Sequence, residues 1–481
     1  MTQPTADPKP PSTGRRRLRG TVVTLALGVT LFAVGAVGLS PWNTEQDRAT
    51  AAAGAPATAG GARADSVTAL REQLRRLPQN ASAWAQLGMA YVQQGRVTAD
   101  PATYAKAEAA LRRSLKELPD DNYQAQVGMG ALAAARHEFT AALAWGREAA
   151  AANPSNAPAQ AVLADAHTQL GQYAASYRAV QRMVDLRPDT SSLARASYTW
   201  ELRGDIPQAR ALMKRALDDA SGPADQAFAR VHLATLAQES GDARTALREA
   251  EQGLRAVPRD AALLEARARA HAALGHDRQA VADYTAAVAI APLPQYVIGL
   301  GELEQSLGHT REAEAQYAFL RTQEQLRRAG GFAPDVDDVL FEADHGEAGR
   351  AVALGRAALK NRPFIAVQDA YAWALHRAGR DAEALTYADR ALSLGTRSAL
   401  FHYHRSVIHR ILGNTASAAK DLDRALAIDP CFHPLHARDA RAERDARDGR
   451  GARTADITRA ADTARTPGAA RAAQQRIDSA S

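Results

Sequence analysis

The sequence contains a single cysteine, Cys431, among 481 residues. One cysteine cannot form an internal disulfide, so packing and hydrogen bonds must hold the fold together. Cys431 does not follow a signal segment, which excludes a lipid-attachment cysteine. Its place after Pro430 fits two interpretations, a small buried apolar residue or an exposed thiol, and we expect the buried one.

Aromatic residues are also few, at 5% of the chain, and alanine dominates. Alanine buries little apolar area, and burial stabilises by roughly 25 cal/mol per Å². An elongated array tolerates such small side chains because every helix packs on two neighbours.

The sequence lacks a glycine-rich phosphate loop, a Gly-x-Ser-x-Gly turn and a Cys-x-x-Cys pair. Acidic pairs such as Asp337/Asp338 fall in loops or at helix ends, where caps are the simpler interpretation. We therefore expect no enzymatic activity, no catalytic residue and no cofactor.

Histidines gather near the C-terminal end of the chain. On one helix, His402 and His409 share a face, whereas His404 points about 200° away, so three ligands cannot meet at one ion. His433 and His436 follow in the next segment. We expect no metal site, with His404 packed between helices and His402 and His409 partly exposed.

Prolines recur at intervals close to one or two multiples of 34 residues. Before most of them lies a pair of small residues seven apart, which places both on one helical stripe. A period of this length indicates a solenoid of helix pairs. The prolines are Pro119, Pro154, Pro188, Pro258, Pro292, Pro363 and Pro430, and the small pairs are Ala142/Ala149, Ala209/Ala216, Ala246/Gly253, Ala280/Ala287, Ala351/Ala358, Ala384/Ala391 and Ala418/Ala425.

The repeat resembles the tetratricopeptide repeat (TPR). The segment from Asn156 to Pro188 carries Leu163-Ala164, the turn residue Gly171 and the closing Pro188, and the first repeat carries Trp84-x2-Leu87-Gly88-x2-Tyr91. The resemblance covers about Asn80 to Pro430, or about ten repeats. It implies an all-α, right-handed superhelical solenoid of antiparallel helix pairs. Two places depart from the pattern: residues Arg96–Ala102 are inserted between the first two helices, and the stretch Phe332–Gly346, after Gly330-Gly331, predicts a kink.

The N-terminal region differs from the repeats. Residues 1–20 are basic, and Thr21–Leu39 contains no charge over nineteen residues, enough for a helix of about 28 Å. We expect an uncleaved, single-pass transmembrane signal anchor of the bacterial type, with its basic end in the cytoplasm and the repeats on the extracytoplasmic side. The alternatives are a cleaved secretory signal, which would make the protein secreted, and a weak twin-arginine signal at Arg15–Leu18.

The remaining boundaries follow from composition. Residues 40–64 are rich in Ala, Gly, Thr and Pro and predict a flexible linker. Residues 65–79 predict a capping half-repeat, and residues 80–430 the solenoid. Residues 431–448 predict a C-terminal capping helix, and residues 449–481 a disordered tail.

Net charge argues against nucleic acid as a partner. The chain carries +6, but residues 1–20 hold +4 and residues 437–481 hold +3, which leaves −1 for the array between them. An array without basic excess cannot neutralise phosphates.

The TPR resemblance implies a concave groove lined by the first helix of each repeat, where peptides or helices of partner proteins bind. Lysine is scarce in the array, which makes a clamp for a chaperone's C-terminal carboxylate unexpected. We expect a non-enzymatic interaction scaffold; a secreted binding protein and a cofactor- or metal-handling protein are the alternatives. The groove positions are Asp369, Trp373, His376, Arg377, Tyr403, Arg410, Gln238, Glu239 and Arg269.

Overall fold

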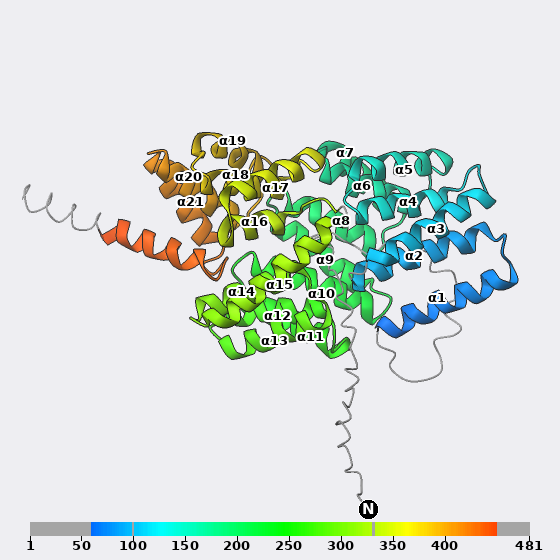
Figure 1. The fold of residues 1–481 in the computed structure, drawn as a ribbon, viewed down its shortest axis with the longest axis horizontal. Coiled ribbons are helices and arrows are strands. Elements are labelled where there is room, and N and C mark those ends of the chain that lie inside the picture. Colours follow the sequence, from blue (N-terminus) through cyan, green and yellow to red (C-terminus); the bar gives the residue numbers. More distant parts are fainter. Residues whose placement is uncertain (1–58, 99–100, 330–331, 450–481) are drawn as a thin grey trace, which may run out of the picture.

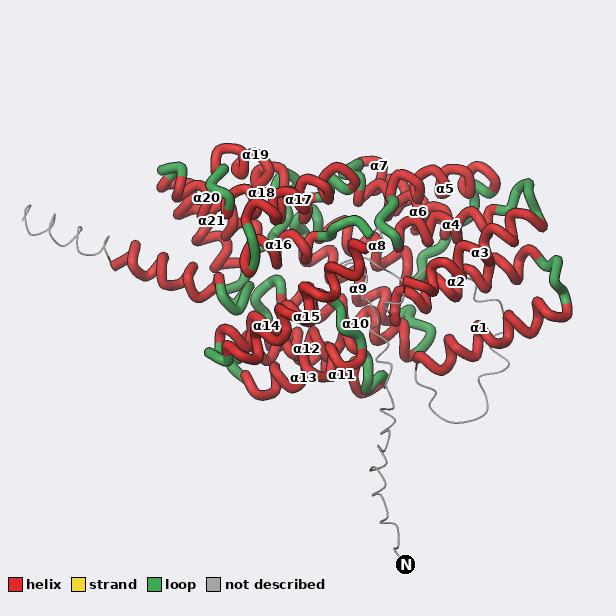
Figure 2. The backbone as a smooth tube through the Cα atoms, in the orientation of Figure 1, coloured by secondary structure: helices red, strands yellow, loops and turns green. Residues whose placement is uncertain are grey.

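The computed structural model describes residues 59–98, 101–329 and 332–449. Regular secondary structure in these ranges is entirely helical (Figures 1 and 2). The helices are α1 (Ala59–Arg76), α2 (Ala81–Thr98), α3 (Pro101–Glu117), α4 (Tyr123–Ala135), α5 (Phe139–Ala152), α6 (Ala157–Gln169), α7 (Tyr173–Leu186), α8 (Thr190–Glu201), α9 (Ile206–Asp218), α10 (Pro223–Gln238), α11 (Ala243–Ala256), α12 (Ala261–Ala273), α13 (Asp277–Ile290), α14 (Pro294–Ser306), α15 (Thr310–Ala329), α16 (Val336–His345), α17 (Ala348–Asn361), α18 (Ile365–Arg377), α19 (Asp381–Ala391), α20 (Ala399–Ile411) and α21 (Thr415–Ile428).

Helices α2–α21 form antiparallel pairs, and one more helix spans residues 436–449. The array is a TPR-like solenoid, as its sequence period predicts. The expected anchor Thr21–Leu39 and residues 40–58 of the expected linker lie outside the described residues, as do residues 450–481. Residues 59–64, also expected to belong to the linker, form the first part of α1. Among the helices that the structure describes, none has the length and apolar character needed to cross a membrane.

The paired small residues lie where the sequence places them, at helix contacts. Ala142, Ala209, Ala280 and Ala351 have no exposed surface. At the second position of the pair in α11, a Cβ added to Gly253 would lie 2.5 Å from a methyl carbon of Leu263. The expectation of close helix approach along this stripe is therefore confirmed, and it explains how an alanine-rich chain packs densely.

The insertion in the first repeat lengthens its two helices. Helix α2 has 18 residues and α3 has 17, whereas most later helices have 13 or 14. The inserted residues therefore extend α2 to Thr98 and begin α3 at Pro101. A similar extension makes α15 the longest helix at 20 residues, directly before the predicted kink.

The superhelix returns on itself after α15. Figure 1 shows the chain passing from α2–α7 through α8–α15 and back, so that α16–α21 lie next to the earlier turn of the array. Glycines in the turns between earlier helices contact the backbone where α17 and α21 end. The carbonyl oxygen of Pro363 would lie 3.0 Å from a Cβ on Gly171, and that of Ile428 would lie 2.9 Å from a Cβ on Gly241.

This contact line, which we call the seam, includes a specific hydrogen bond. The backbone N–H of Ile365 donates to the hydroxyl oxygen of Tyr173 at 3.0 Å, across 192 residues of sequence. Glycines at φ values near +70° leave room for the close approach, because an added Cβ would both strain the turn and collide with the facing backbone. The seam fixes the superhelix in a closed form.

A buried ionic cluster supports the return of the chain. Arg327 of α15 donates to both carboxylate oxygens of Asp338, at 2.9 and 3.1 Å, and Arg362 pairs with Asp335. Burial and the neighbouring carboxylates raise the pKa of Asp337 to about 7. Charges taken out of water require such partners, so this cluster ties α15, α16 and the connection before α18 together.

Candidate functional site

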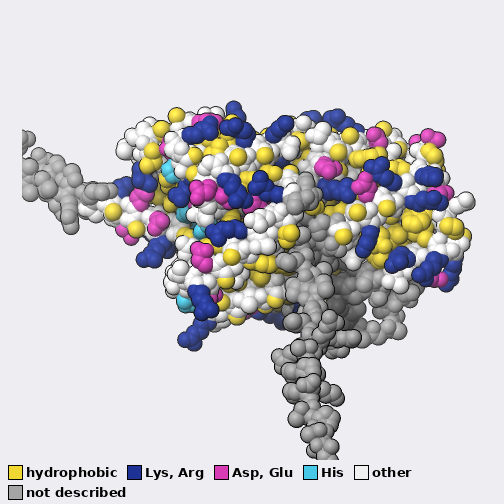
Figure 3. Space-filling view, viewed as in Figure 1, with side chains coloured by type: hydrophobic (Ala, Val, Ile, Leu, Met, Phe, Trp, Pro, Cys, Tyr) yellow, Lys and Arg dark blue, Asp and Glu magenta, His cyan; other side chains and the backbone are white. Residues whose placement is uncertain are grey.

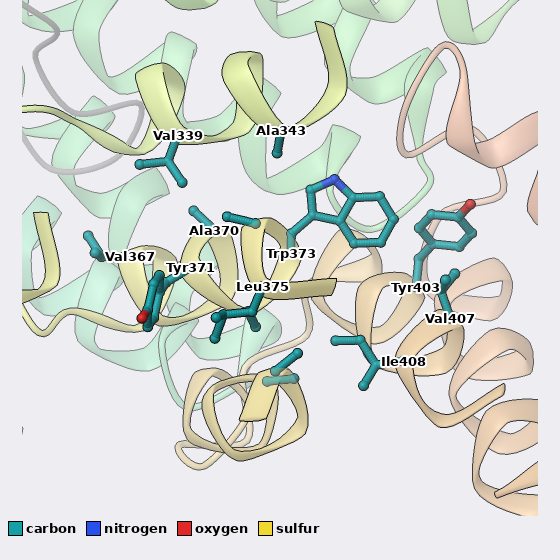
Figure 4. Close-up of a cluster of buried hydrophobic side chains, with 14 of the residues drawn as sticks. Val339, Ala343, Val367, Ala370, Tyr371, Trp373, Leu375, Tyr403, Val407 and Ile408 are labelled. Atoms are coloured by element: carbon teal, nitrogen blue, oxygen red, sulfur yellow. The ribbon is translucent and has the colours of Figure 1, made fainter. Parts of the chain in front are cut away.

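Three of the predicted groove residues on α18 and α20 are buried. Asp369 is 1% exposed and Trp373 is 3% exposed, and Tyr403 is also buried. In Figure 4 the indole ring of Trp373 lies between Ala343 of α16 and the ring of Tyr403. The open groove expected at α18 and α20 is therefore filled by the protein's own residues.

Each buried side chain has an internal partner. His404 contacts Oδ2 of Asp369 through Nδ1 at 2.9 Å, and its ring stacks on Trp373 with centroids 4.2 Å apart. The indole N–H of Trp373 donates to Oδ1 of Asp344 at 2.8 Å. Sequence reasoning correctly placed His404 between helices and left His402 and His409 partly exposed.

The other predicted groove residues have different environments. Arg377 and Arg410 are exposed; Arg377 donates to the carbonyl oxygen of Ala343, and Arg410 lies 3.3 Å from Glu443. His376 contacts Asp381 at 2.6 Å. Their part in partner binding, like that of Asp369, Trp373 and Tyr403, stays a prediction.

Of the predicted positions on earlier repeats, Gln238 is buried, whereas Glu239 and Arg269 are partly exposed. Burial raises the pKa of Glu239, and burial followed by the charge of Glu239 raises the pKa of Glu201 on α8 well above its usual value. Glu201 is the last residue of α8, and Glu239 directly follows α10, so the two carboxyl groups lie at the ends of first helices of successive repeats.

Glu265 of α12 belongs to the same row, with Oε1 3.8 Å from Nε of Arg269. Within the described residues, no cationic side chain forms an ion pair with Glu201 or Glu239. We call Glu201, Glu239, Glu265 and Arg269 the inner acidic row. It lies on the first helices of successive repeats or directly after them.

A second cluster involves residues that sequence reasoning did not connect. Glu302 of α14 contacts His345 at 3.2 Å through Oε1 and His433 at 3.1 Å through Oε2. Asp344 of α16 accepts from Trp373 and contacts His436 at 3.4 Å. The partners lie far apart in sequence, so no local spacing indicates the cluster.

The electrostatics of this cluster follow from burial and pairing. Burial by itself raises the pKa of Glu302, but the charge of His433 and the hydrogen bonds from the two histidines outweigh it and bring the pKa to about 2. Burial lowers the pKa of His433, and Glu302 more than compensates, so its pKa is raised. The pKa of His436 is lowered because burial outweighs its contact with Asp344.

No arrangement of three or more His, Cys, Asp or Glu side chains in the described ranges could hold a metal ion. Instead, His345 and His433 share the carboxylate of Glu302, and His436 contacts Asp344. Cys431 is exposed, so the expectation of a buried thiol is wrong. The physical reason is that Cys431 lies in an irregular segment after α21, where its sulfur approaches the carbonyl oxygen of Ala273 at 3.8 Å and stays at the surface.

Comparisons with known proteins add little beyond the fold. No protein-family model matches the sequence, and no curated protein matches it. Among solved structures, the chain is similar to a human IFIT1 dimer with PPP-AAAA at 16% identity, over 76% of this chain and 87% of that one, with a TM-score of 0.43.

It is also similar to TTC0263, a thermophilic TPR protein of Thermus thermophilus, at 22% identity over 40% of this chain and 98% of that one, with a TM-score of 0.35. The type IV pilus biogenesis factor PilW matches at 17% identity over 42% and 92% of the two chains, with a TM-score of 0.36. Likeness at this level carries no argument about ligand or partner.

Proposed function

We propose that the protein is a non-enzymatic scaffold that binds segments of partner proteins through the inner acidic row. The observation that carries this proposal is the position of Glu201, Glu239 and Glu265 on the first helices of successive repeats or directly after them, where burial raises the pKa of each carboxyl group and Arg269 is the cation beside Glu265. A segment bearing Lys or Arg side chains would neutralise them, which makes basic peptides the favoured partners.

The charge balance of the array supports a protein partner over nucleic acid. The repeats hold no basic excess. On the face shown in Figure 3, Lys and Arg side chains are interspersed with Asp and Glu and form no continuous basic surface. Phosphate recognition would require such a surface.

We also propose that Thr21–Leu39 anchors the scaffold in a membrane and that the repeats face the extracytoplasmic side. The charge-free length of this segment and the arginines before it support this topology. The alanine- and glycine-rich residues 40–58 would then hold the array at a distance from the membrane.

The binding proposal is tested by affinity capture with the full-length chain and its double variant Glu201→Gln, Glu239→Gln. The variant removes two titratable carboxyl groups and keeps side-chain volume, so the affinity for partners that the parent captures should fall by about tenfold or more. The matched control is Glu148→Gln, Glu312→Gln, which removes two exposed carboxylates from the second helices α5 and α15. Equal capture by the parent and the Glu201/Glu239 variant would contradict the proposal.

A further inference from the structure

The chain leaves α21 at Asp429 and then crosses the inner face before the final helix begins at residue 436. We call Cys431–His436 the crossing segment. It contains no regular secondary structure before its last residue. A capping segment would need to cover only the last repeat, so its course over the inner face requires another explanation.

The crossing segment touches the first helices of five successive repeats. The sulfur of Cys431 approaches Ala273 at the end of α12. His433 contacts Glu302 of α14, and His436 contacts Asp344 of α16. These are the helices whose inner faces the TPR resemblance assigns to ligand binding.

Aromatic contacts complete the footprint on α18 and α20. The ring of Phe432 lies 5.3 Å from the ring of Tyr403, and His436 stacks on Tyr403 at 5.2 Å. His436 also meets Trp373 edge to face, with centroids 5.5 Å apart. Aromatic rings in such pairs contribute beyond the area they bury.

The inner-face carboxylates divide their oxygens between the array and the crossing segment. Oε1 of Glu302 contacts His345 of the array, and Oε2 contacts His433 of the segment. Likewise, Oδ1 of Asp344 accepts from Trp373, and Oδ2 contacts His436. Without the segment, one oxygen of each carboxylate would lose its partner, which is unfavourable for buried Glu302 and half-buried Asp344 unless another donor takes its place.

We propose that the inner face of α14–α20 is a peptide-binding surface and that the crossing segment is its built-in competitor. The partner that displaces it is an extended peptide with an aromatic side chain and two basic or imidazole donors, which reach Glu302 and Asp344. This inference rests on the scaffold function proposed above and assigns it a second surface with its own ligand chemistry.

The covalent link explains why the surface is closed in this structure. A segment joined to α21 by a short connection competes at a high effective concentration, of the order of millimolar for short linkers. An external peptide of equal intrinsic affinity therefore cannot displace it at micromolar concentration. Loosening the segment should expose the surface.

The test uses a fluorescein-labelled synthetic peptide with the sequence of residues 429–440, DPCFHPLHARDA. Its binding to the full-length chain is measured by fluorescence polarisation. The wild type should bind weakly, and the variant Phe432→Ala, His433→Ala, His436→Ala should bind at least about tenfold more tightly, because its own segment no longer competes. Adding Glu302→Gln to that variant should weaken binding again.

The matched control peptide carries alanine at the same three positions and should not bind. The proposal is overturned if the triple variant keeps its helical circular dichroism and binds the peptide no better than the wild type. This result would exclude both the competitor and the peptide-binding surface of α14–α20. It would not test the inner acidic row, because the probe peptide is derived from this chain and no residue of that row is altered.

If the triple variant loses helical content, a second variant tests whether Glu302 and Asp344 hold the crossing segment. Glu302→Gln, Asp344→Asn changes only the array side of the contact. Amide hydrogen exchange in residues 431–436 should then rise by about tenfold or more if these carboxylates hold the segment. Unchanged exchange in this segment would overturn the proposal.

Discussion

Gly204, in the turn between α8 and α9, packs directly against the backbone of Gly395, in the connection between α19 and α20. A Cβ added to Gly204 would overlap the carbonyl oxygen of Gly395. The two residues belong to successive turns of the superhelix and lie about 190 residues apart. The relationship shows that the seam depends on backbone contact, which side-chain patterns along the sequence do not record.

The first prediction tests the seam. Gly204→Ala should lower the denaturant midpoint more than Gly275→Ala, which serves as the matched control. Both glycines have φ near +75°, but a Cβ on Gly275 has nothing within 4 Å. The strain of a left-handed alanine is thus common to both variants, and the difference, of roughly 1–3 kcal/mol, reports the collision at the seam. Equal midpoints would mean that the seam opens in solution.

The second prediction concerns the stripe of small residues. Ala280→Leu or Ala418→Leu should destabilise the array by roughly 1–3 kcal/mol, because added atoms overpack a close helix contact. The control is Ala144→Leu, on the exposed side of α5. We compare urea midpoints, since repeat arrays depart from two-state unfolding. If both core variants kept the wild-type midpoint, these alanines would not limit helix approach.

The third prediction concerns Trp373. Because this side chain is 3% exposed, Trp373→Ala should destabilise the protein by about 3–5 kcal/mol, the cost of truncating a large buried aromatic residue. A loss of partner capture in this variant would therefore reflect stability as well as binding. Arg377→Ala, at an exposed position on the same helix, should leave the thermal midpoint within about 1 °C. Similar midpoints for the two variants would contradict the burial of the indole.

The fourth prediction is a pH dependence centred on Glu302. Its pKa falls from 4.5 to about 2 on folding, so its contribution is present above pH 4.5 and disappears as the pH falls toward 2. The pKa of His433 is raised above 6.5, so its contribution is complete below pH 6.5 and disappears as the pH rises through the folded-state value.

The contact should therefore stabilise most between about pH 4.5 and pH 6.5. The urea midpoint of Glu302→Gln should differ most from that of the wild type at pH 5.5, and less at pH 2.5 and at pH 9. His345 and Asp344 face the same pair and are left unchanged. Glu312→Gln, at an exposed site, is the control. A midpoint difference that does not vary with pH would rule out the assigned ion pair.

The fifth prediction concerns topology. Protease added to spheroplasts should digest the repeats and leave a small membrane-bound fragment that contains Thr21–Leu39, because the basic residues before this segment keep the N-terminus in the cytoplasm. Protease added after detergent lysis provides the control, since both sides are then accessible. Recovery of the full-length chain in the soluble cytoplasmic fraction would exclude the anchor.

The sequence by itself determined the local architecture of this protein. Proline spacing, the Ala280/Ala287 type of stripe and turn glycines such as Gly171 all describe contacts between helices that follow one another. Such contacts leave a periodic record because each repeat meets its neighbour in the same way. The helical period also places His404 on the face opposite His402 and His409, between helices.

Only the tertiary structure decided which inner faces are open. The small rotation from each repeat to the next accumulates over many repeats, and its sum brings Gly204 to Gly395 and Tyr173 to Ile365. The same closure allows the crossing segment to reach Glu302 and cover Trp373. Trp373, a predicted groove residue, is therefore buried in this closed array, because burial depends on the sum of many small rotations and no single repeat encodes it.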